Sequence, residues 1–356
     1  MILLNPGPVN VSERVRKALL CPDICHREEE FSELLQGIRK KLLEVFAPDG
    51  FHTAIVLTGS GTAAVEAAIS SCLDQDRKLL VINNGVYGER MGRMAAAYGM
   101  DVAELKFQWQ EKLDLSRLNQ VLNKEPSIQV VAMVHHETTT GMINPVREVG
   151  LLTQQYGKRL LVDSVSGLGG ESLNLAHDRV GICVGTAGKC IQGFPGVAFV
   201  LVRREEMERI QKIPSRSLYL SLQDHFKEQE QGTVPFTPAV QLYYAFDEAL
   251  SELLDEGLDQ RIARYREAAH LLRDGFKKLG LQFLLPDHLR SNTITSLYLP
   301  HGKSYKELHD GLKRRGYVIY AGQGTLQPNI FRVANMGTLK RSDFEGFLCH
   351  LEEVLR

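Results

Sequence analysis

Short, continuously apolar segments rich in β-branched residues recur along the first two-thirds of the chain. Six of them have the length of a strand, at residues 54–58, 78–83, 130–135, 159–164, 181–187 and 196–202. Segments of helical periodicity lie between them, at residues 62–73, 88–98, 116–123 and 147–156. Continuous apolarity, rather than alternation, is typical of strands buried on both faces. The pattern therefore predicts an α/β fold with a mostly parallel sheet.

The remaining third of the chain mixes helical and alternating segments. Residues 203–234 are highly charged and predict a less regular connection. Thr237 followed by Pro238 is typical of a helix start, with Thr237 as the N-cap. Further helical patterns lie at residues 262–279, 305–315 and 342–355, and alternating patterns at residues 293–299, 317–322 and 330–335. We expect a large domain over residues 15–254 and a smaller α+β domain over residues 255–356, with residues 1–14 packed near the smaller one.

The composition argues against several classes of function. The 356 residues carry a net charge of −1, which gives no electrostatic basis for binding nucleic acid or an anionic membrane. Apolar runs such as Val197–Val202 fall far short of the ~20 residues of a membrane span. The amino-terminal stretch has no basic region and is interrupted by Pro6, so it does not resemble a signal peptide. The six cysteines include no C-x-x-C pair, so we expect free thiols and a cytoplasmic protein.

A turn rich in glycine and serine, TGSGTAAVEAA (58–68), separates the first predicted strand from a helix. The backbone at Gly61 can approach an anion closely, the helix N-terminus adds partial positive charge, and Ser60 and Thr62 add hydroxyl donors. The turn is therefore a candidate phosphate cradle. It lacks the GK[ST] of a P-loop, and small residues also occupy such turns for steric reasons alone.

Two charged residues follow predicted buried strands. Asp163 ends the run RLLVD, where open α/β sheets place ligand contacts, although a carboxylate there can also cap the next helix. Lys189 follows the run GICVGTA and has apolar or small neighbours, unlike an ordinary surface lysine. Tyr87 lies in a glycine-flanked turn after a third strand and could equally be a packing residue.

The cradle, Asp163 and Lys189 together match the needs of pyridoxal 5′-phosphate. A lysine amine forms a Schiff base with the cofactor aldehyde, an acid keeps the pyridine nitrogen protonated, and an anion cradle holds the 5′-phosphate. Tyr87 would add an aromatic face over the ring. We therefore expect a pyridoxal phosphate enzyme in which Lys189 is the catalytic residue.

Arg332 lies in the apolar segment IFRVAN, where an unpaired guanidinium is costly. Its planar fork suits bidentate binding of a carboxylate or phosphonate, and pairing with a structural carboxylate is the alternative. His135 and His136 are adjacent at a strand end, so their side chains point to opposite faces. They do not favour a shared metal ion, and we expect no metal site.

Over nearly its whole length the chain resembles the class V family of fold-type I aminotransferases, which includes alanine–glyoxylate aminotransferases. The resemblance is carried by LNPGP (4–8), GSGTAAVEA (59–67), NGVYG (84–88), MVHHETTTGMINP (133–145), GKCIQGFPGVAFV (188–200), SRSLYLSL (215–222) and FRVANMG (331–337). The strings ETTTGM and KCIQG are the most specific. The resemblance implies a seven-stranded, mostly parallel sheet in the large domain, a smaller α+β carboxy-terminal domain, and a homodimer with shared active sites.

The resemblance also implies how the cofactor is held. Lys189 matches the Schiff-base lysine of the family, and Asp163 matches the partner of the pyridine nitrogen. Ser60, Gly61 and Thr62 match the phosphate loop.

Further roles follow from the same resemblance. Tyr87 falls at the ring-stacking position, and Thr139 lies in the segment expected near the ring oxygen. Thr237 matches a residue that reaches the cofactor phosphate of the partner subunit. Arg332 matches the arginine that binds the anionic group of the substrate, and Arg216 is a second cation expected to favour a phosphonate.

Within the family, the chain is most similar to members that transfer the amino group of 2-aminoethylphosphonate to pyruvate, and we expect that activity. The alternative is an alanine or serine aminotransferase that uses glyoxylate or pyruvate. His136 and Gly188 depart from the pattern, since a small residue and a polar residue, respectively, are expected there. Both flank the expected site, so they bear on the identity of the substrate more than on that of the cofactor.

Three other readings are less well supported. A non-catalytic binding protein would leave Lys189, Asp163 and Arg332 unexplained together. A cysteine desulfurase of the same fold would have histidines where Tyr87 and Gly188 stand. A dehydrogenase would need an acidic ribose-binding residue where Asn83 and Asn84 stand.

Overall fold

A seven-stranded sheet dominates the computed structural model, which describes residues 1–356. The strand order is β2-β10-β9-β8-β5-β3-β4. Neighbouring strands are parallel except at β10, which is antiparallel to both of its neighbours. The strands are β2 (His52–Gly59), β3 (Lys78–Asn83), β4 (Asp101–Lys106), β5 (Ile128–Val134), β8 (Arg159–Asp163), β9 (Ile182–Thr186) and β10 (Gly196–Arg203). The predicted α/β class and mostly parallel seven-stranded sheet are confirmed.

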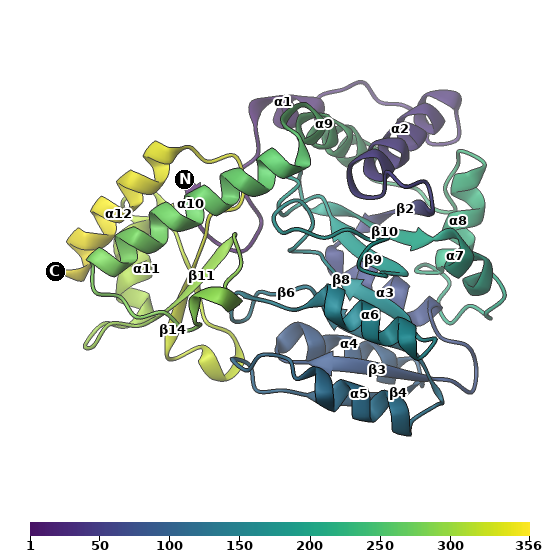
Figure 1. Ribbon diagram of the computed structural model, residues 1–356. Helices are drawn as coiled ribbons and strands as arrows, with labels where there is room; N and C mark the ends of the chain where they lie inside the picture. The colour runs from purple at the N-terminus through teal and green to yellow at the C-terminus, as the bar shows by residue number, and fades with distance from the viewer.

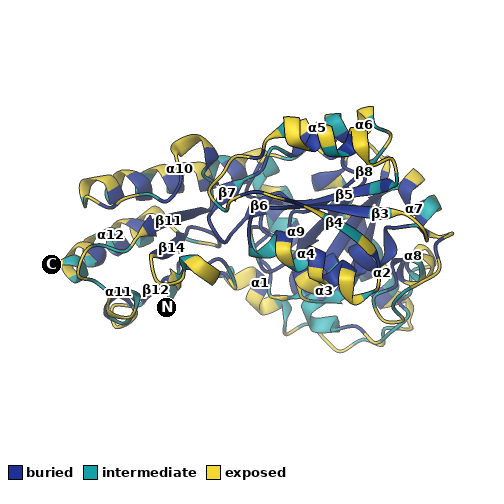
Figure 2. Ribbon diagram, turned by 90° about the horizontal axis from the view of Figure 1, so that it is seen from below, coloured by how far each residue is buried: buried dark blue, intermediate teal, exposed yellow.

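Helices cover both faces of this sheet, which Figure 2 shows as a dark blue buried layer between partly exposed helices. Successive strand residues point to opposite faces, so Ala54 and Val56 join one hydrophobic cluster while Ile55 and Leu57 join another. The first cluster includes residues of α2 (Glu29–Phe46), α5 (Leu115–Lys124), α6 (Val146–Gln155) and α9 (Val240–Glu256). The second includes residues of α3 (Gly61–Ser71), α4 (Val86–Ala97), α7 (Arg204–Ile210) and α8 (Leu222–Glu230). Burial on both faces explains why the strands are apolar throughout.

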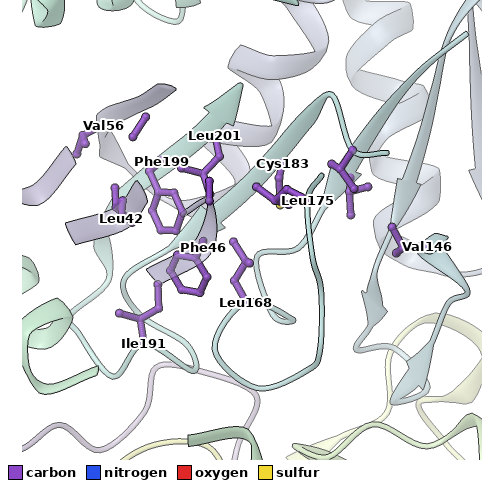
Figure 3. Close-up of a cluster of buried hydrophobic side chains, with 14 of the residues drawn as sticks. Leu42, Phe46, Val56, Val146, Leu168, Leu175, Cys183, Ile191, Phe199 and Leu201 are labelled. Atoms are coloured by element: carbon purple, nitrogen blue, oxygen red, sulfur yellow. The ribbon is translucent and has the colours of Figure 1, made fainter. Parts of the chain in front are cut away.

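Aromatic rings fill the first cluster beside β10, as Figure 3 shows for part of it. The ring of Phe199 stacks on that of Phe46, with centroids 6.2 Å apart, and on that of Phe246, with centroids 5.8 Å apart. These contacts join β10 to α2 and α9. The helices that flank the sheet are therefore held by close packing of large side chains, and the strand ends keep fixed positions.

A second region is built on a three-stranded antiparallel sheet in the order β11-β14-β13. Its strands are β11 (Ile294–Tyr298), β13 (Tyr320–Ala321) and β14 (Ile330–Ala334), and its helices are α10 (Leu258–Lys278), α11 (Tyr305–Lys313) and α12 (Arg341–Leu355). We call it the small-sheet region; Figure 1 shows it beside the large-sheet region. The chain start belongs here, because β1 (Ile2–Leu3) pairs with β12 (Tyr317–Val318). The predicted boundary at 254/255 lies in the last turn of α9 and stays a prediction.

Three predictions of local structure were wrong. Residues 203–234 contain the two helices α7 and α8, since a charged segment can still bury one apolar stripe. Helix α9 begins at Val240 with Ala239 as its N-cap, so Thr237 does not cap it. Strand β4 was not predicted because it is an edge strand in which most side chains are not fully buried. The short elements α1 (Glu13–Ala18), β6 (His136–Glu137), β7 (Met142–Ile143), η1 (Asp287–Leu289) and η2 (Gly324–Leu326) complete the fold.

No helix of the structure combines the length and apolarity that crossing a membrane requires.

Candidate active site

The candidate residues gather at one edge of the large sheet because the strands that precede them all end there. Strands β3, β5, β8 and β9 are mutually parallel, and β2 shares their direction because β10 is antiparallel to both β2 and β9. The carboxyl ends of parallel strands meet at one edge, where open α/β sheets bind ligands. The residues that directly follow these strands therefore face a common space, with the small-sheet region beside it in Figure 1.

The turn after β2 has the geometry of an anion cradle. Ser60 is the N-cap of α3, and its Oγ accepts a hydrogen bond of 3.3 Å from the N–H of Ala63. Gly61 is the first residue of the helix, and an added Cβ there would lie 2.7 Å from Cγ1 of Val165, so only glycine fits. The free N–H groups of the first turn and the exposed hydroxyls of Ser60 and Thr62 remain available to an anion.

Arg90 is a site residue that the sequence did not indicate. It lies on α4, its Nη1 donates to Oγ1 of Thr62 over 3.2 Å, and its guanidinium lies 4.8 Å from the centre of the Tyr87 ring. Thr62, Tyr87, Arg90 and Asp163 line one narrow pocket. Arginine is common on exposed helix faces, so only the packing of α4 against α3 reveals this cation beside the cradle.

Asp163 ends β8 as a buried carboxylate, 7% exposed, with no cationic partner in a salt bridge. Its Oδ1 accepts one hydrogen bond of 3.0 Å from the N–H of Val165. Burial raises the pKa of Asp163 to about 6. A buried carboxylate without a paired cation is unfavourable unless a ligand supplies the positive charge, so the site is suited to a cationic or hydrogen-donating ring nitrogen.

Lys189 lies in the turn after β9, and its amine Nζ donates to the carbonyl oxygen of Pro6. The lysine packs against Gly7, where a Cβ would lie 2.8 Å from its Cδ. Because β1 pairs with β12, the LNPGP stretch that follows β1 lies against Lys189. Burial lowers the pKa of the Lys189 amine to about 8. A larger fraction is then neutral and nucleophilic near neutral pH than for an ordinary lysine.

Glu137 organises the centre of the site and was not predicted. It is fully buried in β6; its Oε1 accepts from the hydroxyl of Thr139 over 2.6 Å and from the N–H of Thr139 over 3.1 Å. Its Oε2 accepts from the N–H of Tyr87 over 3.3 Å. Burial raises the pKa of Glu137 to about 7. Glu137 therefore sets the positions of Tyr87 and Thr139, and the hydroxyl proton of Thr139 is already engaged.

Arg332 reaches from β14 of the small-sheet region toward the large-sheet region and is 1% exposed. Its Nε donates to the carbonyl of Ala321 over 2.8 Å, and its Nη1 donates to the carbonyl of Thr138 over 2.7 Å and to Oε1 of Gln323 over 3.2 Å. Its Nη2 is buried without any partner. Burial lowers the pKa of Arg332 from its ordinary value. A buried guanidinium with a free N–H group and no carboxylate is a suitable receptor for an anion.

Arg216 does not join this cluster. Its Nη1 donates to the carbonyl of Ser70 over 3.2 Å, near the carboxyl end of α3. The cradle lies at the other end of that helix, which is roughly 15 Å away at 1.5 Å per residue. The expectation that Arg216 contacts the substrate in its own chain is therefore not supported, because the helix separates it from Arg332 and Lys189.

Thr237 is also outside the cluster of its own chain. It is exposed in the segment that precedes α9. The adjacent Ala239, rather than Thr237, is tied to the sheet, through a 3.1 Å hydrogen bond from its N–H to Oγ1 of Thr58.

The two departures from the family pattern lie close to Lys189. Nδ1 of His136 is 3.2 Å from the carbonyl of Ser166 and must donate to it, while Nε2 is buried without a partner. Burial lowers the pKa of His136 to about 3, so the ring is neutral. Gly188 packs on Pro195, where an added Cβ would lie 3.0 Å from the proline ring.

The two adjacent histidines have separate partners, since Nδ1 of His135 lies 2.9 Å from the hydroxyl of Ser164. No group of three or more His, Cys, Asp or Glu residues is arranged to hold a metal ion.

Comparison with known proteins identifies the family of the chain. The model of the family "Aminotransferase class-V" matches residues 17–350. A protein of Syntrophobacter fumaroxidans named 2-aminoethylphosphonate–pyruvate transaminase is 40% identical over 94% of this chain and 91% of its own length. A protein of Klebsiella pneumoniae with the same name is 37% identical over 99% and 97%.

Solved structures of aminotransferases are also similar to this chain. Alanine–glyoxylate aminotransferase of Nostoc sp. superposes with a TM-score of 0.94 at 28% identity, covering 100% of this chain and 95% of its own. Pyridoxamine–pyruvate aminotransferase of Mesorhizobium loti superposes with a TM-score of 0.92 at 27% identity, covering 100% and 92%. The chain is an aminotransferase and belongs to the class V family.

The lowered pKa of Lys189 is open to direct measurement. Only the neutral amine reacts with acylating reagents, so in the apoprotein the labelling rate of Lys189 should rise with pH and level off above pH 8. An unperturbed lysine, with a pKa of ~10.4, should still gain reactivity beyond pH 10. Peptide mass spectrometry after brief labelling at each pH gives both curves. A midpoint for Lys189 near pH 10.4 would show that burial does not affect its amine.

Proposed function

We propose that the protein catalyses transamination between 2-aminoethylphosphonate and pyruvate, giving phosphonoacetaldehyde and L-alanine, with pyridoxal 5′-phosphate as cofactor. The observation that carries this proposal is the buried, carboxylate-free guanidinium of Arg332 with its unpartnered Nη2. Such a group can receive a phosphonate in one half-reaction and a carboxylate in the other. The names of relatives 35–40% identical over nearly the full length support this choice of substrates.

The residues present fit the proposed cofactor at three points. The exposed hydroxyls of Ser60 and Thr62 and the start of α3 suit a phosphate. The carboxylate of Asp163 has no cationic partner and suits a protonated ring nitrogen. The amine of Lys189 suits an aldehyde. Tyr87 lines the same pocket as Asp163 and can cover one face of a ring.

The chain's own residues can then perform the proton transfers. When bound, pyridoxal phosphate supplies an aldehyde that carries the amino group and a ring that withdraws electrons from the reacting carbon. Arg332 binds the anionic end of the donor and orients its amino-bearing carbon toward Lys189. Nζ of Lys189, with a pKa of about 8, removes the proton from that carbon as a general base and donates a proton in the next step as a general acid. Asp163, whose pKa burial raises to about 6, would be mostly ionised at neutral pH and would stabilise a protonated ring nitrogen.

Single-turnover assays with different amino donors test the proposed substrates. 2-Aminoethylphosphonate should convert the yellow enzyme more efficiently than alanine or serine, and pyruvate should restore it. Lys189→Ala should show very low turnover, and borohydride followed by mass spectrometry should place the cofactor on Lys189 in the wild type. Clearly higher efficiency with alanine or serine and glyoxylate would replace the phosphonate assignment with an alanine–glyoxylate type of activity.

The two arginines should behave differently. Arg332→Leu removes the proposed anion receptor and should lower kcat/KM roughly tenfold to a hundredfold in both half-reactions, on the basis of ~1.5–3 kcal/mol for a charge-assisted hydrogen bond. Arg216→Leu is the matched control because its guanidinium binds Ser70 at the far end of α3. Equal losses for the two variants would contradict the assignment of Arg332 as the receptor.

We further propose that the protein is a homodimer in which Thr237 approaches the partner's cradle. Leu218 is 81% exposed and Tyr219 46% exposed. Tyr219 packs on Phe236, with centroids 5.0 Å apart, and its OH lies 3.4 Å from the carbonyl of Thr58 at the end of β2. An exposed apolar surface thus adjoins the cradle and Thr237. Such a surface is typical of a subunit interface.

Sedimentation should give a dimer for the wild type, and Leu218→Glu should weaken it by burying a charge at the interface. Phe51→Glu is the control, because Phe51 is also apolar and exposed but precedes β2 at the opposite edge of the sheet. A fully active monomer at assay concentrations would disprove the shared site.

A further inference from the structure

Gln323 is the only side chain that accepts a hydrogen bond from Arg332. The other two acceptors of the guanidinium, Ala321 and Thr138, are backbone carbonyls. Because a guanidinium has donors only, the amide of Gln323 must turn its oxygen toward Nη1 of Arg332. The amide nitrogen Nε2 is then a second donor beside the guanidinium, and it has no partner in the protein. The hydrogen-bonded pair of Gln323 and Arg332 thus has two donors without a protein partner: Nη2 of Arg332, which is buried, and Nε2 of Gln323, which is on a half-buried side chain.

The turn that carries Gln323 is held by the large-sheet region through Trp109. Trp109 lies in the segment between β4 and α5 and is the only tryptophan of the chain. Its six-membered ring lies on Gly324, where an added Cβ would be 2.5 Å from Cη2. Gly324 has a φ of +52°, a left-handed conformation that also favours glycine. In Figure 1 the yellow-green end of the small-sheet region meets the blue loops of the large sheet here.

We propose that Gln323, held in place by Trp109, is a specificity-determining residue that donates its Nε2–H to the third oxygen of a phosphonate bound at Arg332. A carboxylate has two oxygens and a single negative charge, and the unpartnered Nη2 of Arg332 is the guanidinium donor left free to bind it. A phosphonate has three oxygens and a larger negative charge, so an additional donor favours it over a carboxylate. This inference rests on the proposed function and supplies the second phosphonate contact that Arg216 does not provide.

The test compares two unreactive anions, ethylphosphonate and propionate, which lack an amino group and differ only in the anionic head. Binding to the holoenzyme is measured by calorimetry. Gln323→Leu should weaken ethylphosphonate about tenfold, the effect of losing one hydrogen bond to a charged group, and propionate less than threefold. Gln323→Glu places a carboxylate against Arg332 and should weaken both anions, ethylphosphonate more. Gln327→Leu, exposed on the same turn, should bind both as the wild type does.

Trp109 provides an independent readout of positioning. Trp109→Ala should reduce the preference for ethylphosphonate over propionate, and Trp109→Phe, which keeps an aromatic ring on Gly324, should largely restore it. The same variants should raise KM for 2-aminoethylphosphonate more than they lower kcat. Thermal melting identifies any variant that has lost its fold. If Gln323→Leu is one of them, Gln323→Met, which keeps the length of the side chain and removes its N–H donor, takes its place in the comparison of the two anions.

Several outcomes would overturn the inference. Equal effects of Gln323→Leu on both anions, or no effect on either, would remove Gln323 from phosphonate recognition. If the wild-type enzyme prefers 2-aminoethylphosphonate while Gln323→Leu keeps the wild-type preference, only this inference fails. If the wild-type enzyme prefers alanine with glyoxylate, the proposed function fails and this inference fails with it.

Discussion

The shared direction of six strands is the constraint on which the site depends. Strands β2, β3, β4, β5, β8 and β9 all end at one edge, even though β10 runs the opposite way between β2 and β9. A parallel sheet needs crossover helices on its faces, and those helices bury each strand on both sides. The strand ends are therefore rigid, and residues from distant parts of the chain meet there. Cradle, aspartate and lysine owe their proximity to this arrangement rather than to direct contacts among themselves.

Buried charge without a compensating partner is the second common feature of this edge. Asp163 has one hydrogen bond and no salt bridge, Arg332 has no carboxylate, and the Lys189 amine rests on a carbonyl. Burial favours the neutral form of each group, so it raises the pKa of Asp163 and lowers the pKa of Arg332 and of Lys189. Each such group is costly in the protein alone. A ligand with a phosphate, a ring nitrogen and an aldehyde, together with an anionic substrate, would compensate all of them at once.

In the proposed mechanism, the small-sheet region contributes recognition rather than proton transfer. Its strand β14 presents Arg332, and the turn after β13 presents Gln323. From the large-sheet region, the carbonyl of Thr138 accepts a hydrogen bond from Arg332, and Trp109 packs on Gly324 next to Gln323. The hydrogen bond to Thr138 and the packing of Trp109 therefore join the two regions of the molecule next to the proposed anion-binding guanidinium of Arg332. A change in their relative position would alter substrate binding before it altered the lysine or the cradle.

The sequence by itself determined the class of fold, the order along the chain of every strand of the large sheet except β4, and the lysine, aspartate and glycine-rich turn as candidates. Those features depend on local patterns: continuous apolarity, turn residues, and charges placed directly after strands. Only the tertiary structure decided which charges meet. It separated Arg216 from the site along the length of α3, moved the start of α9 past Thr237, and revealed Glu137, Arg90 and Gln323. Their roles depend on contacts between segments far apart in the chain, and a glutamate or glutamine next to a turn carries no local signal of such a contact.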